Sequence, residues 1–356
     1  MGYEVDFIQV GQESKSGDAI ALRWGDDLYN NGEQFVAVID GGYKNSGEDS
    51  VRNSGEDLAE LIKKYYHAKA IDLVVSTHPD ADHIGGLSYI LDEFDVKKLW
   101  IHKPWEHNND IAKDDYKAAW ELCEQARAKN IDVEEPFFDK LSPVECRHSN
   151  GVLRVVGPSK KYYKSLLPNF GKTLGTAKSE ESALGMVQGL AQEAIAWAKD
   201  LWDKDSIDDE GETSARNNSS TIIEFMYNDR KILFTADAGI PAFDSASDNV
   251  KNTGELRMIQ IPHHGSRRNV GPRALNNMVG DIVGKNVSKN IIAIASCAKK
   301  PDRKHPSQRV LNAFIRRGCE CHKLSKSEGH RHAYDAPDRQ GYTEAKACEF
   351  DSNVEE

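Results

Sequence analysis

The most informative stretch of the chain is Ile71-Asp72-Leu73-Val74-Val75-Ser76-Thr77-His78-Pro79-Asp80-Ala81-Asp82-His83-Ile84-Gly85-Gly86. Its first six residues are mostly apolar, which predicts a buried strand that ends at Ser76. Four side chains that can bind metals follow within six positions, namely His78, Asp80, Asp82 and His83. Carboxylates this close repel and desolvate one another unless a cation neutralises them, and imidazole with carboxylate is a ligand set for Zn²⁺ or Mn²⁺. The stretch therefore predicts a metal site on the loop that follows the strand.

The rest of the chain alternates between strand patterns and helical patterns. Apolar and β-branched segments predict strands at 5–10, 18–24, 35–39, 71–76, 98–101, 152–156, 220–227, 231–235, 258–261 and 291–296. Apolar spacing and composition predict helices at 55–66, 87–94, 112–129 and 306–317. Two runs of strands, with helices between them and polar loops after the strand ends, suit two sheets packed face to face with helices outside. We therefore expect an α/β sandwich.

One long segment, residues 159–216, interrupts this pattern. Within it, residues 179–202 have the composition of a helix, and residues 203–212 are strongly acidic and predict a mobile stretch. We interpret 159–216 as an insertion that either caps the site or forms a packed peripheral helix without a catalytic part. The prediction is a single domain over residues 1–335, followed by a polar tail at 336–356.

The composition is that of an ordinary globular protein of the cytoplasm. Hydrophobic residues make up 39% of the chain and charged residues 29%. No apolar run approaches the roughly 20 residues that span a bilayer, and residues 1–10 lack the basic start of a secretory signal. We therefore expect no membrane partner and a cytoplasmic location. The six cysteines are expected to be free thiols, although Cys319 and Cys321 with His322 nearby offer a second metal site without the spacing of a zinc ribbon.

The net charge of −11 argues against a protein whose whole task is gripping duplex DNA, because such proteins are usually basic. Short basic clusters nevertheless occur at Arg267-Arg268, at 299–304 and at Arg316-Arg317. The first two flank loops of the candidate site, so they suit either phosphate contact or ordinary solvated surface. We interpret Arg316-Arg317 as solvated surface charge.

The run from His78 to His83 resembles the metal-binding signature of the metallo-β-lactamase superfamily, usually His-x-His-x-Asp-His, with Asp80 in place of the second histidine. Other short motifs resemble one branch of that superfamily, the hydrolase domain of the ComEC DNA-uptake competence proteins and its soluble relatives. In chain order they are Asp-Phe-Ile-Gln-Val-Gly-Gln at 6–12, Gly-Asp-Ala-Ile at 17–20, Asn-Asn-Ser-Ser at 217–220, Thr-Ala-Asp-Ala-Gly at 235–239, Pro-His-His-Gly-Ser at 262–266 and His-Pro-Ser at 305–307. The resemblance runs from about residue 3 to about residue 330, apart from the insertion. It implies a metallo-β-lactamase αββα sandwich with a helical insertion.

The resemblance also implies a centre of two divalent metal ions, Zn²⁺ or Mn²⁺. The first ion would be held by His78, Asp80 and a bridging Asp237. The second would be held by Asp82, His83, Asp237 and either His263 or His264, and the remaining histidine would contact substrate. The carboxylate of Asp80 shifts the preference of the first site from Zn²⁺ towards Mn²⁺.

Two further positions bear on this centre. Where most members of the superfamily have another histidine, this chain has Asn218 and Ser219, so the first ion is expected to bind weakly or only with substrate present. Asp40 matches an aspartate that braces the metal loop, and its alternative role is a turn-forming Asp-Gly.

A centre of two metal ions roughly 3.5–4 Å apart would lower the pKa of a shared water, and the resulting hydroxide would attack phosphorus or a carbonyl carbon. The catalytic set is then Asp82, His264 and His305. His305 is a candidate acid for the leaving alkoxide or a candidate phosphate contact, against the alternative of a surface-loop histidine. Ser266 and Arg267 directly follow the paired histidines and are candidates for contacts with substrate.

Three functions stay open. The first, favoured by the resemblance, is a two-metal phosphodiesterase or nuclease that acts on nucleic acid. The second is a hydrolase of small phosphodiesters such as cyclic nucleotides, which the acidic body and the insertion favour. The third is an effector component of a multi-protein assembly, for example in defence, that is gated by a protein partner or by homo-oligomerisation. A β-lactam substrate is not expected, because neither this branch nor a cytosolic location suits one.

Overall fold

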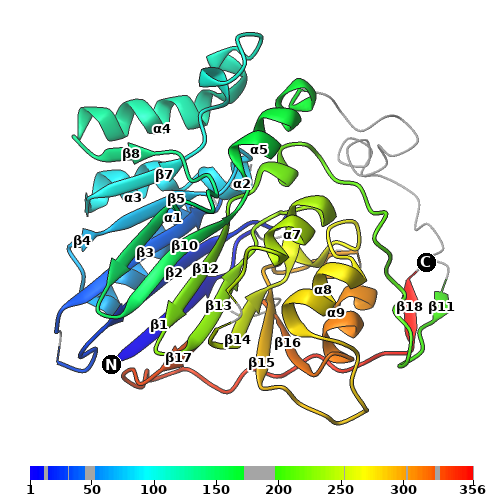
Figure 1. Ribbon diagram of the computed structural model, residues 1–356. Helices are drawn as coiled ribbons and strands as arrows, with labels where there is room; N and C mark the ends of the chain where they lie inside the picture. Colours follow the sequence, from blue (N-terminus) through cyan, green and yellow to red (C-terminus); the bar gives the residue numbers. More distant parts are fainter. Residues whose placement is uncertain are drawn as a thin grey trace.

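The structure is a computed structural model of the chain, and it describes residues 1–11, 15–30, 32–44, 53–171, 197–251, 253–301, 304–324 and 329–355. Two sheets of seven strands each pack face to face, and helices cover the outer face of each sheet (Figure 1). This arrangement confirms the predicted α/β sandwich.

The first sheet has the strand order β17-β1-β2-β3-β5-β7-β8. The pairs from β17 to β3 are antiparallel, and those from β3 to β8 are parallel. Its strands are β1 (Gly2–Ile8), β2 (Ala19–Gly25), β3 (Gln34–Gly41), β5 (Leu73–Ser76), β7 (Lys98–Ile101), β8 (Asp132–Glu134) and β17 (Gly329–Tyr334).

The second sheet has the strand order β16-β15-β14-β13-β12-β10-β9. Here the pairs from β16 to β13 are parallel, and those from β13 to β9 are antiparallel. Its strands are β9 (Glu145–His148), β10 (Gly151–Gly157), β12 (Ile222–Tyr227), β13 (Arg230–Phe234), β14 (Glu255–Gln260), β15 (Ile291–Ala295) and β16 (Cys319–Lys323). Two short ladders lie outside the large sheets, one between β4 (Ala70–Ile71) and β6 (Asp95–Val96) and one between β11 (Trp197–Lys199) and β18 (Asn353–Glu355).

The helices divide between the two outer faces. The first sheet is covered by α1 (Ser54–Leu61) with its π-helical extension Ile62–Tyr66, α3 (Leu87–Glu93) and α4 (Lys117–Ala128). The second is covered by α7 (Ile240–Ser247), α8 (Pro272–Val279) and α9 (Gln308–Ile315). The single turn α2 (Ala81–Ile84) lies in the predicted metal loop, and α5 (Lys160–Leu166) follows β10. Within the described ranges, no helix has the length and apolar character that crossing a bilayer requires.

Alternation along the strands builds three apolar layers. In β2, the side chains of Ile20, Leu22 and Trp24 belong to the core between the two sheets, whereas Ala19 and Ala21 belong to the core under the first set of helices. Successive side chains of a strand point to opposite faces, so one segment contributes to two layers. The sandwich is thus buried on both faces of each sheet, which explains why its strands are almost continuously apolar.

Two predictions about the long insertion need comment. Residues 197–199, predicted as part of a helix, form the strand β11, because its backbone hydrogen bonds are met by β18 near the end of the chain. Most of the predicted helix, residues 179–196, lies outside the described residues. The acidic stretch is anchored rather than mobile: Asp205 accepts hydrogen bonds from Arg316 at 3.1 Å and from Arg317 at 2.6 Å.

The interpretation of Arg316 and Arg317 as solvated charge was wrong. Both side chains are fully buried, and Arg316 also pairs with Asp200 at 2.7 Å. A buried guanidinium needs carboxylate partners, and Asp200 and Asp205, both within the predicted insertion, supply them. Because these partners lie far apart in the sequence, no local sequence pattern predicts that they pair.

The C-terminal segment packs along the first strand. Arg339 donates to both carboxylate oxygens of Asp6, at 2.8 and 2.9 Å, and Arg331 pairs with Glu4. Both carboxylates are buried, so the two arginines neutralise charges that β1 carries into the interior.

Candidate metal centre

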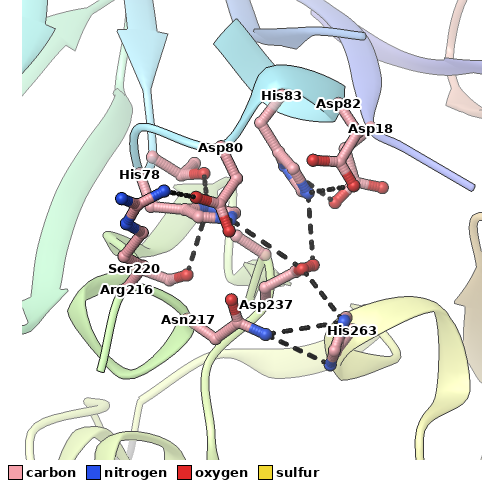
Figure 2. A network of polar contacts seen from close by, with 12 residues as sticks. Asp18, His78, Asp80, Asp82, His83, Arg216, Asn217, Ser220, Asp237 and His263 are labelled. Carbon is pink, nitrogen blue, oxygen red and sulfur yellow. Dashed lines mark hydrogen bonds and ion pairs between the residues drawn. The ribbon is translucent and has the colours of Figure 1, made fainter. Parts of the chain in front are cut away.

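The predicted site residues converge at one edge of the sandwich, where parallel strands of both sheets end (Figure 2). Asp40 lies at the end of β3, and the loop from Thr77 to Gly86 follows β5. From the other sheet come Asp237, just beyond β13, and the pair His263-His264, just beyond β14. Carboxyl ends of parallel strands meet at the same edge, which is how motifs 160 residues apart become neighbours.

Asp237 stands at the centre, and its two oxygens face different groups. Its Oδ1 lies 3.3 Å from His83 Nε2 and 3.8 Å from His264 Nε2, and both of these nitrogens also face Asp82 Oδ2, at 3.8 and 3.9 Å. Its Oδ2 lies 3.8 Å from His78 Nε2 and 3.4 Å from His263 Nε2. One carboxylate is therefore shared between two sets of metal-binding atoms.

The first of these sets fits a metal ion closely. Ligand atoms of Asp82, His83, Asp237 and His264 all lie within 4.8 Å of one another. Within the described structure, the Nε2 atoms of His83 and His264 and the Oδ1 of Asp237 are buried and have no hydrogen-bond partner. Buried polar atoms are normally paired, so three lone pairs aimed at one point are best explained by a cation that binds there. We call this set the Asp82 cluster.

The second set surrounds the other oxygen of Asp237. His78 Nε2, also buried without a hydrogen-bond partner in the described structure, faces Asp237 Oδ2 and lies 3.8 Å from Asp80 Oδ2. Asp80 is turned partly outward, since its other oxygen lies 3.4 Å from the guanidinium of Arg216. This set, called the His78 side below, is more open than the Asp82 cluster.

Asp40 contacts the loop that carries the candidate ligands. It accepts the Thr77 backbone N–H at 2.8 Å and the Thr77 hydroxyl at 2.6 Å, and it pairs with His83 Nδ1 at 2.8 Å. Because Nδ1–H donates to Asp40, the lone pair of His83 resides on Nε2, which faces the Asp82 cluster. The side chain of Asp40 thus fixes both the path of the loop and the tautomer of a ligand candidate.

Asp18 also lies beside the candidate centre, although its place in the motif at 17–20 did not predict a role for it. Its buried carboxylate lies behind two histidines, 3.6 Å from His83 Nδ1 and 3.9 Å from His264 Nδ1. Gln260 Nε2 donates to it at 2.7 Å. The available signal was an Asp next to Gly17 at the start of an apolar strand, which alone does not distinguish a site residue from a turn.

The structure separates the two adjacent histidines. His264 Nε2 points into the Asp82 cluster, whereas His263 Nε2 faces the other oxygen of Asp237. Both residues have left-handed backbone angles, φ of 45° and 55°, which turns consecutive side chains towards one centre. Asn269 fixes His263, because its Nδ2 donates to the Asp237 carbonyl at 3.0 Å and its Oδ1 must then accept from His263 Nδ1, at 2.9 Å.

The remaining predicted residues lie around this centre at different distances. Asn218 donates to the Ser214 carbonyl and Ser219 to the Arg216 carbonyl; in their place Asn217 contacts His263 at 3.4 Å, and Ser220 Oγ lies 3.4 Å from His78 Nδ1. Ser266 is buried and accepts the Arg268 N–H, and Arg267 is exposed. The His305 ring lies 6.0 Å from that of His263, between their centroids.

The charges of the cluster depend on one another. Burial alone would raise the pKa of Asp237, but the imidazoles of His263 and His83 hold it well below its ordinary value. Burial alone would lower the pKa of His83 and His264, yet Asp237 and its neighbours raise the first well above its ordinary value and the second to about 9. A bound divalent cation would replace these imidazole protons, so metal binding would compete with protonation of the histidines.

The family comparison agrees with this geometry. Residues 28–157 match the model described as the metallo-beta-lactamase superfamily. The chain has the metallo-β-lactamase fold. The matched region contains β3, β5 and the loop with His78, Asp80, Asp82 and His83, and the two-sheet sandwich extends that fold to the second half of the chain. No curated protein sequence matches the chain.

Several solved structures with low sequence identity are similar to the chain. Igni18, a metallo hydrolase from the hyperthermophilic archaeon Ignicoccus hospitalis, is 12% identical with a TM-score of 0.43, over 93% of this chain and 98% of that one. Unliganded yeast PDE1 is 10% identical with a TM-score of 0.44, over 92% and 98%. A diphosphatase of the PhnP family is 8% identical with a TM-score of 0.41, over 94% and 98%.

Proposed function

We propose that the protein is a metal-dependent hydrolase that cleaves phosphodiesters. The observation that carries the proposal is the shared carboxylate of Asp237, with buried, unpartnered ligand atoms of histidines on both of its sides. Two divalent ions at such a centre supply an activated water and neutralise charge that develops on the oxygens of the substrate.

Different residues of the candidate centre would bind the ions, orient the ligands and donate a proton. Asp82, His83, His264 and Asp237 would hold one ion, and His78, Asp80 and Asp237 would hold the other. Asp40 pairs with His83 Nδ1 at 2.8 Å and leaves Nε2 of that histidine free, and the Asp18 carboxylate lies 3.9 Å from His264 Nδ1. His305, whose ring centroid lies 6.0 Å from that of His263, would give a proton to the leaving oxygen.

Carboxylate and imidazole ligands suit either Zn²⁺ or Mn²⁺, and the oxygen-rich His78 side favours Mn²⁺ there. Nucleic acid was the first-ranked substrate from the sequence. The acidic segment within the insertion argues against nucleic acid: Gly211 packs against the Arg268 backbone and Asp209 accepts the Arg273 N–H, so acidic residues lie beside the basic site loop. Acidic neighbours weaken the counterion-driven attraction that a polyanion needs.

The test is hydrolysis of bis(p-nitrophenyl) phosphate by protein loaded with Mn²⁺ or Zn²⁺, beside single-stranded DNA, duplex DNA, RNA and cyclic nucleotides. The Asp82→Ala protein is the control, because it removes one ligand candidate from the tighter cluster. Metal-dependent release of nitrophenolate that is lost in the control supports the proposal. If the wild-type protein binds two ions and cleaves none of these esters, the proposal fails, and a role gated by a protein partner becomes the better reading.

A further inference from the structure

A hollow of about 780 Å³ opens beside the His78 side of the candidate centre. Residues from the loop after β7, from the turn before α4 and from α5 with the segment that follows it form its walls. Lining residues that matter here are Asp110, Asp115, Tyr116, Lys164, Phe170 and Arg216. The volume lies within the range of about 300–1,000 Å³ that sites for small molecules occupy.

Arg216 joins this hollow to the candidate centre (Figure 2). Its Nη1 lies 3.4 Å from Asp80 Oδ1, and its guanidinium lies over the ring of Tyr116, 5.0 Å from the centroid. Its Nε is buried and has no hydrogen-bond partner among the described residues. An unpaired buried donor costs about 1–3 kcal/mol, and a contact of 3.4 Å is long for a charged pair. Arg216 therefore keeps donor capacity next to a metal-ligand candidate.

The other walls indicate what the rest of the ligand looks like. Tyr116 and Phe170 line the hollow with largely buried aromatic rings, whose exposed edges suit contact with a planar ring system. Lys164 adds a cation, whereas Asp110 and Asp115 add carboxylates. Carboxylates can accept hydrogen bonds from sugar hydroxyls and base amino groups, but they repel further phosphates. A polymer with a phosphate at every residue fits such walls poorly.

We propose that this hollow binds the nucleoside part of a small phosphodiester, of one or two nucleotides, and that Arg216 contacts its phosphate. The inference rests on the proposed function and names its substrate class. In the reaction, the oxygen of a water molecule forms the new bond to phosphorus and the water gives up a proton. The bond from phosphorus to the leaving oxygen breaks, and the leaving oxygen takes up a proton, so that the protons balance. Arg216 approaches the phosphate from the side of Asp80, and the hollow positions the ester for the attack.

Two variants and a matched control test the hollow. Arg216→Gln removes the charged donor, and Lys164→Trp fills the hollow from the exposed face of α5. Lys161→Trp is the control, since Lys161 is an exposed lysine of the same helix that does not line the hollow. Circular dichroism and thermal unfolding check that each variant is folded. If Arg216→Gln does not fold, the test of the hollow rests on Lys164→Trp.

The first readout is calorimetric binding of thymidine 5′-monophosphate to the metal-depleted protein, which does not depend on turnover. Loss of a hydrogen bond to a charged group costs about 1.5–3 kcal/mol, so Arg216→Gln should weaken binding by roughly 10- to 150-fold. Lys164→Trp should weaken it about 10-fold or more by occupying the space, a loss of about 1.4 kcal/mol. Lys161→Trp should bind like the wild type.

The second readout compares two esters with the same leaving group, the p-nitrophenyl ester of thymidine 5′-monophosphate and bis(p-nitrophenyl) phosphate. Lys164→Trp should raise KM for the nucleoside ester by a larger factor than KM for bis(p-nitrophenyl) phosphate, and Lys161→Trp, which lies outside the hollow, should leave both values unchanged. If the wild type hydrolyses bis(p-nitrophenyl) phosphate but nucleotide binding is undetectable, or is equal in all variants, this inference is overturned and the proposed function stands. If nucleotide binding depends on Arg216 and Lys164 but no ester is cleaved, the proposed function fails and the nucleotide site stands.

Discussion

Replacing Asp40 by Asn tests how far the candidate centre depends on a group that is not itself a ligand candidate of the Asp82 cluster. Asp40 takes part in three short contacts, with the Thr77 N–H, the Thr77 hydroxyl and His83 Nδ1, at 2.8, 2.6 and 2.8 Å. An amide replaces one acceptor oxygen by an NH₂ group. If that group stands at the position of Oδ2, it faces the Thr77 hydroxyl and the His83 N–H, which are both donors in the wild type.

Two magnitudes follow. Leaving a buried donor unpaired costs about 1–3 kcal/mol, so the free energy of unfolding should fall by that order. Loss of the partner that orients a metal-binding histidine typically lowers metal affinity by about 10- to 100-fold, because Nε2 is no longer held towards the ion in the right tautomer. The second effect is specific to the centre, whereas the first is shared with any buried aspartate.

A matched control separates the two effects. Asp72 ties the same two strands at their other end, where it accepts the Val36 N–H at 2.9 Å and pairs with Lys97 at 2.6 Å. Zn²⁺ affinity is measured by competition with a chromophoric chelator, and stability by thermal unfolding of the metal-depleted protein. Asp72→Asn should lose stability but keep its Zn²⁺ affinity within about twofold, well below the change expected at Asp40. Equal Zn²⁺ affinities in Asp40→Asn and Asp72→Asn would refute the reasoning.

Three further outcomes are expected. Asp237→Ala should keep a native circular dichroism spectrum, bind fewer ions and lose more than roughly 100-fold in turnover rate, because removal of a residue that only orients a ligand already costs up to that factor. Near-normal turnover would remove Asp237 from the site. Elemental analysis should find two divalent ions per chain, with Mn²⁺ supporting turnover at least as well as Zn²⁺ because Asp80 offers a hard oxygen; a chain that stays metal-free after loading contradicts this. Burial lowers the pKa of His330 and of His332 to about 4. Their folded pKa lies below the unfolded value, so their stabilisation is complete above about pH 6.5 and is lost as the pH falls towards 4, by about 2 kcal/mol each at pH 5. His332→Gln should therefore flatten the decline in the unfolding midpoint between pH 7 and pH 5, and an unchanged slope would count against it.

The sandwich and the metal loop were predictable because their signals are local. The apolar run before His78 and the clustered ligands lie within one short segment, and the alternation in β2 follows from the two faces of a strand. The choice between His263 and His264 was not predictable, since it depends on two consecutive left-handed backbone conformations that ordinary sequence patterns do not encode. Their roles as ligands remain proposals that the variants above test.

Other features depend on contacts between distant segments. Arg316 and Arg317 looked like surface charge because their partners Asp200 and Asp205 lie more than 100 residues away. Asp18 and Arg216 are ordinary polar residues in sequence, and only packing brings the first behind two histidines and the second beside Asp80. Strand β11 was read as helix because the segment 179–202 has a helical composition and the partner strand β18 lies far away in the sequence.

The pairing of β1 with β17 has a consequence for how the protein is made. Strand β1 is completed by residues that are synthesised some 330 positions after it, because Tyr3 pairs with Tyr334 and Asp6 with Arg331 in the ladder. Until Arg339 arrives, the Tyr66 hydroxyl is the side-chain partner of Asp6 among the described residues, and an uncompensated buried carboxylate costs several kcal/mol. The nascent chain therefore holds an unfinished sheet until β17 is synthesised, with β1 as an open edge that can pair with another chain.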